Sequence, residues 1–321
     1  MVSKLRHEPV SDADQPGQDQ VPAGVRELLA AVPSLAGRAS QISVLTGGLT
    51  NQNFRVTTER GCFVARLWSD GTMLGIDRER EYRNSVLAAE AGVGAPVVEY
   101  RPQDRVLVLG YIDGKTLGNA DVGEPAMIPR IAAACRALHG AGRFAGDFDM
   151  FEIQAGYYRV ATEAGMPIPA GYADLLPAFA AAREALAPGD EGTVPCNNDL
   201  LAANFIDDGE RIWVIDYEYS GNNDPCFELG NIAGECGLDA EALAALVTAY
   251  YGRARRSRIA RAEVFRLVSR YGWTLWGAIQ SATSDLNFDF WSWGMERFEA
   301  AAAGFTSPAF ARLLSDVQDG D

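Results

Sequence analysis

A polar segment in the second half of the chain combines carboxylate and amide side chains at close spacing. It extends from Cys196 to Asn204, and the apolar run that follows it leads into Ile215-Asp216-Tyr217-Glu218-Tyr219. The carboxylate of Asp199 can accept a proton from a hydroxyl group, and the oxygen atoms of Asn204 and Asp216 suit Mg²⁺ that bridges nucleotide phosphates. A single Asp or Asn is common in turns. The joint spacing between apolar runs favours a site of metal-assisted phosphoryl transfer.

The charge of the chain disfavours several other classes of function. The chain has 321 residues, with 28 Lys and Arg against 43 Asp and Glu, which gives a net charge of −15. Nucleic-acid binding requires a cationic stripe, so a surface this acidic is unsuited to it and to anionic membrane surfaces. We find no run of about 18 apolar residues that could span a bilayer, and the first residues lack a signal-peptide pattern.

The cysteine and histidine content indicates a reducing compartment and disfavours a zinc site. The five cysteines lack CxxC spacing, and in a chain of this length they indicate reduced, mostly buried thiols. The two histidines, His7 and His139, are too few for most histidine-based catalysis. We therefore expect a cytoplasmic protein, and we interpret His139, at the end of a predicted helix, as structural.

Hydrophobic patterning predicts a β-rich first part and a larger helical second part. Strands are predicted at 42–45, 53–57, 62–68, 97–101 and 105–110. Asp77 can cap a helix at 77–91 that stops at Gly92. Further helices are predicted at 26–32, 128–139, 172–186, 240–251, 262–283 and 295–305. A small β region is predicted at 193–196, 205–207 and 211–217.

These elements predict an α+β fold with three parts. Residues 1–22 form a polar tail with little to bury. Residues 23–110 form a β-rich N-terminal lobe, and residues 111–321 form a larger, mostly helical lobe that holds the polar segment.

A glycine turn near the start of the β-rich part is a second candidate site. Gly47 and Gly48 let backbone N–H groups approach phosphate oxygens closely, and Thr50 and Asn51 add side-chain donors. Taken alone, such a pair of glycines more often marks an ordinary β-turn. Its interpretation therefore depends on the other motifs.

The ordered set of motifs resembles the choline/ethanolamine kinases, a branch of the aminoglycoside-phosphotransferase and protein-kinase-like superfamily. The resemblance extends from about Ile42 to Phe298. Each motif is weak alone, and the ordered set is strong. The pieces are Thr46–Asn51, Phe63–Arg66, Asp77-Arg78 with Glu81, Asn197–Asn204, Asp216–Ser220, Phe227–Asn231 with Glu235, Trp273–Trp276, and Phe288–Phe298.

The resemblance implies a protein-kinase-like two-lobe fold whose first lobe binds ATP. It implies that the guanidinium of Arg66 grips two phosphate oxygens and that Glu81 holds Arg66 through an ion pair. The nucleotide-binding residues implied in addition are Gly47, Gly48, Thr50, Asn51, Leu109 and Tyr111.

The resemblance also implies roles for residues of the second lobe. Asp199 would be the catalytic base, and Asn204, Asp216 and Glu218 would bind Mg²⁺. The positively charged nitrogen of the acceptor would lie among aromatic faces and a carboxylate, which replace its lost hydration. The residues implied for this cage are Tyr219, Glu235, Trp273, Trp276 and Trp293. Core packing is the alternative for these aromatic residues, and for Trp273 it has equal weight.

Three positions depart from the pattern of the family. Asn197 stands where a histidine usually braces the loop, although an amide can donate and accept hydrogen bonds likewise. Cys236 stands where the eukaryotic enzymes carry tryptophan, and Trp293 stands where tyrosine is common. The cage is therefore expected to be one wall short, which leaves room for a different amine.

We expect a Mg²⁺-dependent kinase that transfers the γ-phosphate of ATP to the hydroxyl of choline or a related amino alcohol. Ethanolamine, thiamine or an aminoglycoside is an alternative acceptor, although the tryptophans disfavour the carboxylate-rich cleft of aminoglycoside kinases. A catalytically silent, nucleotide-binding pseudokinase is the alternative from another class, because of Asn197. The joint presence of Asp199, Asn204, Asp216 and Arg66 disfavours it.

Overall fold

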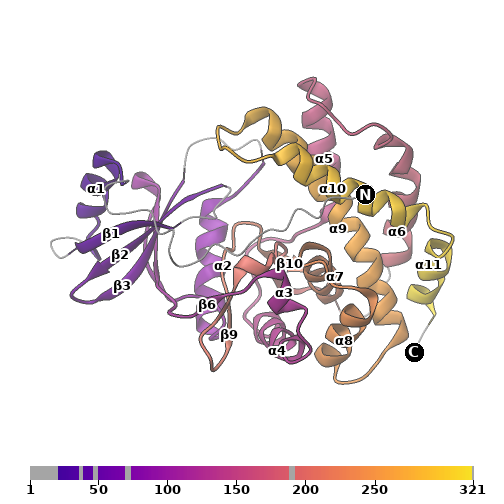
Figure 1. Ribbon diagram of the computed structural model, residues 1–321, viewed down its shortest axis with the longest axis horizontal. Coiled ribbons are helices and arrows are strands. Elements are labelled where there is room, and N and C mark those ends of the chain that lie inside the picture. The colour runs from indigo at the N-terminus through magenta and orange to yellow at the C-terminus, as the bar shows by residue number, and fades with distance from the viewer. Residues whose placement is uncertain (1–20, 36–38, 46–49, 69–73, 188–191, 320–321) are drawn as a thin grey trace. The chain divides into compact units, whose positions relative to one another are not determined.

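Two compact units share the chain. The computed structural model describes residues 21–35, 39–45, 50–68, 74–187 and 192–319. The first unit contains the described residues up to 68 together with Pro96–Asp113, and the second contains the rest. The first unit holds a five-stranded sheet and the second is mostly helical, which confirms the predicted α+β class (Figure 1). Most of the predicted tail, residues 1–22, lies outside the described residues.

The change of unit falls close to the lobe boundary that the sequence predicts. The chain passes into the second unit after Asp113, whereas the prediction puts the boundary after residue 110. Helix α2 (Arg78–Glu90) lies between strands of the first unit in sequence, and yet it groups with the second unit by its contacts. Asp77 caps α2 by accepting the backbone N–H of Arg80 (3.0 Å), as predicted.

The first unit is an antiparallel sheet with the strand order β1-β2-β3-β5-β4. Its strands are β1 (Ala39–Leu45), β2 (Gln52–Thr58), β3 (Gly61–Leu67), β4 (Val97–Arg101) and β5 (Val106–Gly110), and each overlaps its predicted range. Alternation along β2 buries Phe54 and Val56 on one face. Helix α1 (Ala23–Ala30) packs its Leu29 into the same hydrophobic core.

Short strands in the second unit flank the polar segment. The strands are β6 (Lys115–Thr116), β7 (Val194–Cys196), β8 (Phe205–Asp207), β9 (Ile212–Val214) and β10 (Gly221–Asn223). β7 pairs with β10, and β8 lies between β6 and β9. The prediction that the strand of β9 reaches residue 217 is wrong. Asp216 has a positive φ of 66°, which an extended strand does not accommodate, so its carboxylate belongs to the turn after the strand.

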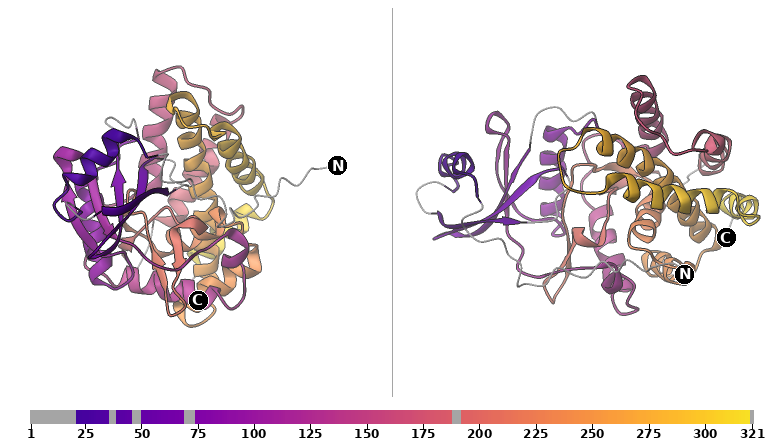
Figure 2. Two further views of the ribbon diagram at one scale, coloured as in Figure 1. Left: turned by 60° about the vertical axis from the view of Figure 1, so that its left-hand side comes forward. Right: turned by 45° about the horizontal axis from the view of Figure 1, so that its top comes forward.

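A long central helix organises the second unit. α9 (Arg256–Thr283) packs against α5 (Met150–Glu163), α7 (Pro225–Glu235), α10 (Phe290–Phe305) and α11 (Phe310–Gln318). Figure 2 shows α10 lying along α9 in both views. The remaining helices are α3 (Asn119–Val122), α4 (Ile128–His139), α6 (Leu176–Leu186) and α8 (Ala240–Tyr251).

The helices of the second unit differ from the prediction mainly at their starts. α4 and α8 have the predicted bounds, but α9 begins at Arg256 rather than residue 262, and α10 begins at Phe290 rather than residue 295. The patterning does not predict α3, α5, α7 or α11. α7 nevertheless carries a start signal, because Asp224 accepts the N–H of Cys226 (2.8 Å) and Pro225 occupies the first turn.

The described part of the chain contains neither a helix that could cross a membrane nor a disulfide. No described helix is both long and apolar enough to span a bilayer. All five cysteines are free, and four of them are buried. Burial raises the pKa of the Cys135 and Cys196 thiols well above the ordinary value, which keeps both protonated. The prediction of reduced, mostly buried thiols is confirmed.

The close packing of α7 on α9 depends on the absence of a side chain at Gly230. A Cβ atom there would collide with the carbonyl oxygen of Ala262 and would lie 2.8 Å from the backbone nitrogen of Arg266. We expect Gly230→Ala to lower the free energy of unfolding by about 1–3 kcal/mol, because a rotamer change cannot relieve a clash with backbone. Urea unfolding followed by circular dichroism measures the loss.

Gly156→Ala is the matched control for this prediction. Gly156 lies inside α5, and a Cβ atom there would meet nothing within 4 Å. The control should keep or raise the stability, by up to about 1 kcal/mol, because alanine is the better helix former. Equal losses in the two variants would contradict the packing argument.

Candidate active site

The polar loop, residues 197–204, leaves strand β7 through a left-handed residue. Asn198 has a positive φ of 71°, which is uncommon for a residue other than glycine. Its buried side-chain nitrogen donates to three backbone carbonyl oxygens at 3.2–3.3 Å, those of Cys196, Tyr219 and Gly221. These bonds offset the strain of the turn and fix the direction in which the loop leaves the strand.

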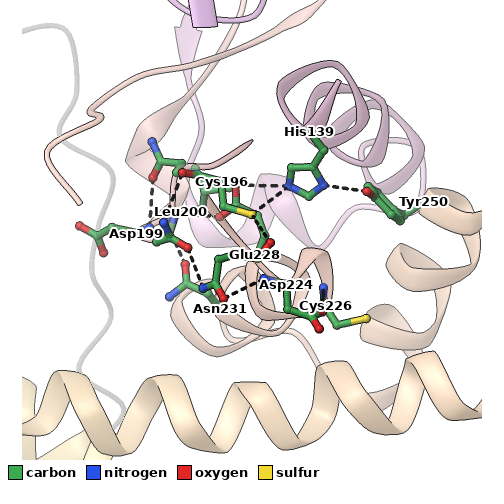
Figure 3. A network of polar contacts seen from close by, with 12 residues as sticks. His139, Cys196, Asp199, Leu200, Asp224, Cys226, Glu228, Asn231 and Tyr250 are labelled. Atoms are coloured by element: carbon green, nitrogen blue, oxygen red, sulfur yellow. Dashed lines mark hydrogen bonds and ion pairs between the residues drawn. The ribbon is translucent and has the colours of Figure 1, made fainter. Parts of the chain in front are cut away.

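The carboxylate of Glu228, on α7, holds the first two backbone amides of the polar loop. Its Oε1 accepts the N–H of Asn197 (2.8 Å), and its Oε2 accepts the N–H of Asn198 (2.7 Å). Glu228 is fully buried, so water does not compete for these charge-assisted bonds. A second residue of α7 takes part, because Asn231 Oδ1 accepts the N–H of Leu200 (2.7 Å). Figure 3 shows this network.

The side chain of Asn197 braces the polar loop in the way that the sequence analysis expects of an amide. Its Nδ2 donates to the carbonyl oxygens of Asp216 (2.7 Å) and Ile215 (3.2 Å). Its Oδ1 accepts the backbone N–H of Asp199 (3.1 Å). One side chain therefore ties the backbone at residue 199 to the backbone at residue 216.

Asn204 makes a second connection between the same two segments. Its Nδ2 donates to the carbonyl oxygen of Asp199 (2.7 Å), and its own carbonyl oxygen accepts the N–H of Ile215 (3.0 Å). The structure thus brings together the three residues that the sequence predicts at the centre of the site, Asp199, Asn204 and Asp216.

The carboxylates of the site lie near enough to one another to perturb ionisation. Burial, followed by the negative charges of Glu235, Asp216 and Glu218, raises the pKa of Asp199 well above its ordinary value. The positive charge of Arg297 acts in the opposite direction. Four of the predicted acidic residues of the second unit therefore act on one region.

Arg78, at the start of α2, reaches two of the predicted site residues. Its Nη1 lies 2.7 Å from a carboxylate oxygen of Glu81 and 3.3 Å from a carboxylate oxygen of Glu218. This guanidinium partly neutralises both carboxylates. Arg66 belongs to the first unit, so the predicted ion pair between Arg66 and Glu81 stays a prediction.

The four predicted aromatic residues, together with Tyr157, form one contiguous group, which we call the aromatic cluster (Tyr157, Tyr219, Trp273, Trp276 and Trp293). Trp276 Nε1 donates to the hydroxyl of Tyr219 (2.7 Å), and the hydroxyl of Tyr157 lies near enough to Tyr219 to contribute to the raised pKa of that residue, after burial. Ring centroids are 5.1 Å apart for Trp276 and Trp293 and 5.0 Å apart for Tyr219 and Trp273. Trp273 and Trp276 are both buried. These two side chains therefore contribute to the packing of the second unit, and their predicted role in binding stays a prediction.

Glu235, predicted to face a cationic nitrogen, is held by an arginine of the protein. Arg297 Nε donates to Glu235 Oε1 (3.2 Å), and Arg297 Nη2 donates to Glu235 Oε2. The carbon of the same guanidinium lies over the ring of Trp293, 3.3 Å from the ring centroid. The sequence analysis does not foresee this contact.

His139, at the end of α4, contacts the carboxylate that holds the polar loop. Its Nε2 lies 3.7 Å from Glu228 Oε1 and 3.6 Å from Cys196 Sγ, and its Nδ1 lies 2.7 Å from the hydroxyl of Tyr250. Figure 3 shows the imidazole between Tyr250 and Glu228. His139, which the sequence analysis interprets as structural, thus lies directly behind the polar loop.

The glycine turn of the first unit is described in part. Gly47 and Gly48 lie outside the described residues. Thr50 and Asn51 lie just before β2, and Asn51 Nδ2 donates to Thr50 Oγ1 (3.1 Å). The role of this turn in nucleotide binding stays a prediction.

The other predicted nucleotide-binding residues lie on neighbouring strands of the first unit. Arg66 is buried on β3, where its Nε donates to Asn53 Oδ1 (3.4 Å). Leu109 lies on β5, and Tyr111 follows that strand. The guanidinium carbon of Arg55 lies 4.3 Å from the centroid of the Tyr111 ring. β3 and β5 are paired, so these residues share one part of the sheet.

Comparison with known proteins identifies the family of the chain. Residues 41–259 match the family described as phosphotransferase enzymes (APH). The chain belongs to this phosphotransferase family. Ethanolamine kinase 2 of Mus musculus is 30% identical over 281 residues, which cover 78% of this chain and 72% of that relative.

Solved structures resemble this phosphotransferase over most of its length. A choline/ethanolamine kinase family protein from Mesorhizobium loti has a TM-score of 0.81 and 34% identity, covering 92% of this chain and 98% of that one. The choline kinase LicA from Streptococcus pneumoniae shares the fold, with a TM-score of 0.71 and 24% identity over 83% and 94% of the two chains. The predicted small-molecule kinase with a protein-kinase-like fold is confirmed.

Several residues that shape the site of this phosphotransferase are not singled out by sequence reasoning. Tyr157 lies on α5, a helix that the patterning misses. Glu228 and Asn231 fall inside a recognised motif, but nothing in the sequence shows that they reach the backbone of the polar loop. Arg297 had a usable signal, because it lies four residues after Trp293 on the same helix and therefore on the same face.

The raised pKa of Asp199 predicts a pH-dependent effect of Asp199→Asn on stability. Above about pH 3.9, the unfolded-state value, folding opposes ionisation of this carboxyl, and below it both states are protonated. In buffer with chelator, the variant should therefore resist urea better than wild type at about pH 7.5, and the gain should vanish near pH 4.

Asp208→Asn is a control with the opposite sign. The backbone N–H of Arg211 and the indole N–H of Trp213 lower the pKa of Asp208 to about 2. Its contribution to stability is present above the unfolded-state pKa and is lost as the pH falls through the folded-state pKa. The Asp208 variant should thus be less stable than wild type at neutral pH. A gain in both variants would refute the electrostatic explanation.

Proposed function

We propose that this kinase transfers the γ-phosphate of ATP to the hydroxyl group of choline or a related amino alcohol. The position of Asp199 is the observation that carries the proposal. Its carboxylate interacts with Asp216 and Glu218, which suit a metal ion, and also with Glu235 beside the aromatic cluster. One side chain thus links oxygen ligands for a metal to aromatic faces that suit a cationic nitrogen.

Asp199 is the proposed catalytic base. As the hydroxyl oxygen of the acceptor forms its bond to the γ-phosphorus, the bond between that phosphorus and the bridging oxygen breaks and ADP leaves. The hydroxyl proton passes to a carboxylate oxygen of Asp199. Neighbouring carboxylates raise the proton affinity of Asp199, which suits this role. Glu228 accepts the backbone N–H of Asn197, and the side chain of Asn197 accepts the backbone N–H of Asp199. Because these bonds hold the backbone at Asp199, the base needs little reorganisation before proton transfer.

The residues that would hold Mg²⁺ are Asn204, Asp216 and Glu218. Hard oxygen ligands of this kind fit Mg²⁺. Asn204 uses its Nδ2 for the carbonyl oxygen of Asp199, which assigns its Oδ1 as the ligand atom. After burial, the negative charges of Glu235, Asp216 and Glu218 raise the pKa of Asp199. A divalent cation would offset these charges. When bound, Mg²⁺ would neutralise charge on the transferred phosphate.

We assign the nucleotide to the first unit. The buried guanidinium of Arg66 offers the planar fork that suits phosphate oxygens, and Glu81 is its proposed partner. The proposed contacts of the rest of the nucleotide are Gly47, Gly48, Thr50, Asn51, Leu109 and Tyr111.

Asn197 is the reason to consider a pseudokinase. Its amide donates to two carbonyl groups and accepts from Asp199, so the polar loop is braced without an imidazole at this position. This supports an active enzyme. The names of the relatives, an ethanolamine kinase and a choline/ethanolamine kinase family protein, support an amino alcohol as the acceptor.

A coupled ADP-release assay over a panel of acceptors tests the proposal. The panel contains choline, ethanolamine, their methylated intermediates, thiamine and two aminoglycosides. We expect turnover with at least one amino alcohol, and a loss of at least about a hundredfold in kcat for Asp199→Asn, since a positioned base contributes that much or more. Nucleotide affinity should be preserved in the variant. Wild-type inactivity on every acceptor of the panel would favour the pseudokinase, whereas activity on thiamine or an aminoglycoside alone would favour that acceptor.

Trp276→Ala tests whether the aromatic cluster binds the acceptor. Loss of this ring should raise the KM for the amino alcohol by at least about tenfold, because a desolvated cation–ring contact contributes on the order of 2 kcal/mol. The KM for ATP should change much less. Trp276→Phe keeps a ring face but loses the hydrogen bond to Tyr219. Its KM for the amino alcohol should lie between those of wild type and Trp276→Ala. Equal increases in both KM values would argue against the cluster.

A further inference from the structure

A guanidinium of the protein occupies two of the five groups predicted to receive the cation of the acceptor. Arg297 donates through Nε and Nη2 to the two carboxylate oxygens of Glu235. The same guanidinium covers a face of Trp293, 3.3 Å from its ring centroid. A carboxylate together with an aromatic face is the combination that holds an organic cation. Arg297 is therefore an internal occupant of this part of the cage.

The Arg297–Glu235 pair is held firmly enough to remain when an acceptor binds. The side chain of Glu235 is 1% exposed and that of Arg297 is 13% exposed. Arg297 Nη1 also donates to the carbonyl oxygen of Trp293 (3.1 Å), so all three nitrogens of the guanidinium are engaged. Breaking one side of a buried ion pair leaves an uncompensated charge, which is strongly unfavourable.

The polar atoms of the aromatic cluster either have partners already or can only donate. The hydroxyl of Tyr219 accepts the N–H of Trp276, and the hydroxyl of Tyr157 donates to the carbonyl oxygen of Leu74 (3.5 Å). The indole N–H of Trp273 is a donor, which does not suit an ammonium group. The cluster thus offers ring faces to a ligand rather than hydrogen-bond acceptors.

We propose that Arg297 determines specificity by reserving Glu235, so that the site prefers a quaternary, methylated nitrogen over a primary ammonium. This inference rests on the proposed function and selects the acceptor within it. A primary ammonium has three N–H donors that need acceptors when it leaves water. A trimethylated nitrogen has no N–H, and ring faces alone replace its weaker hydration.

The kcat/KM for choline divided by that for ethanolamine tests the inference. We expect wild type to favour choline. Arg297→Gln releases the carboxylate of Glu235, so the ratio should fall at least about tenfold, since a hydrogen bond to a charged group is worth that factor. This fall is expected to come from a higher kcat/KM for ethanolamine, caused by the freed carboxylate. The double variant, which combines Arg297→Gln with Glu235→Gln, should therefore lose the increase.

Two further variants complete the test, one a conservative substitution and the other a control. Arg297→Lys leaves one oxygen of Glu235 open, so the ratio should shift in the same direction by less, and this variant decides the matter where Arg297→Gln does not fold. Arg130→Gln is the matched control. Arg130 also forms a partly buried ion pair, and its partner is Asp207, which lies on β8. The control should leave the ratio unchanged.

The outcomes separate this inference from the proposed function. Turnover of ethanolamine equal to that of choline by wild type, an unchanged ratio in the Arg297 variants, or a gain that survives Glu235→Gln would overturn the inference while the kinase assignment stands. If wild type phosphorylates neither, the proposed function fails. Tryptophan fluorescence titrations with tetramethylammonium and methylammonium then still decide, because tighter binding of methylammonium by wild type would overturn the inference.

Discussion

The geometry of the site depends on the buried carboxylate of Glu228. A carboxylate in the protein interior is unfavourable unless its oxygens are hydrogen-bonded. Two backbone amides just before Asp199 supply those bonds, and the amides in turn would be orphaned donors without the carboxylate. Each side therefore stabilises the other. Displacement of the polar loop would leave both unsatisfied, so the loop is fixed relative to α7.

This rigidity is what allows several negative charges to be concentrated in one region. Without compensation, the carboxylates around Asp199 would repel one another or bind protons. Burial first, and then the negative charge of these neighbours, raises the pKa of Asp199. Two arginines relieve this repulsion at the margins, because Arg78 pairs with Glu218 and Arg297 pairs with Glu235. Asp199 retains a high proton affinity, which suits its proposed role as a base. The arrangement opposes stability and serves chemistry.

The sequence predicts well what depends on short spacing and poorly what depends on contacts between distant segments. Asp199 and Asn204 are close in sequence, and the amide of one does reach the backbone of the other. The five strands of the first unit are also predictable, since each is a short β-branched or aromatic run. Tyr157 escapes prediction because its helix has no clear start signal beyond Asp149. The pairing of Arg297 with Glu235 joins two helices far apart in the chain, and no local pattern encodes it.

Asn197 shows how a departure from a family pattern can be accommodated by hydrogen-bond valence. A side-chain amide has two N–H donors and a carbonyl acceptor, and here all three functions are used, toward Ile215, Asp216 and Asp199. A neutral imidazole has one donor and one acceptor, so it could not make all of these bonds. An amide also does not titrate, so the brace is independent of pH near neutrality. The imidazole of His139 lies instead behind Glu228, where it contacts the carboxylate without touching Asp199.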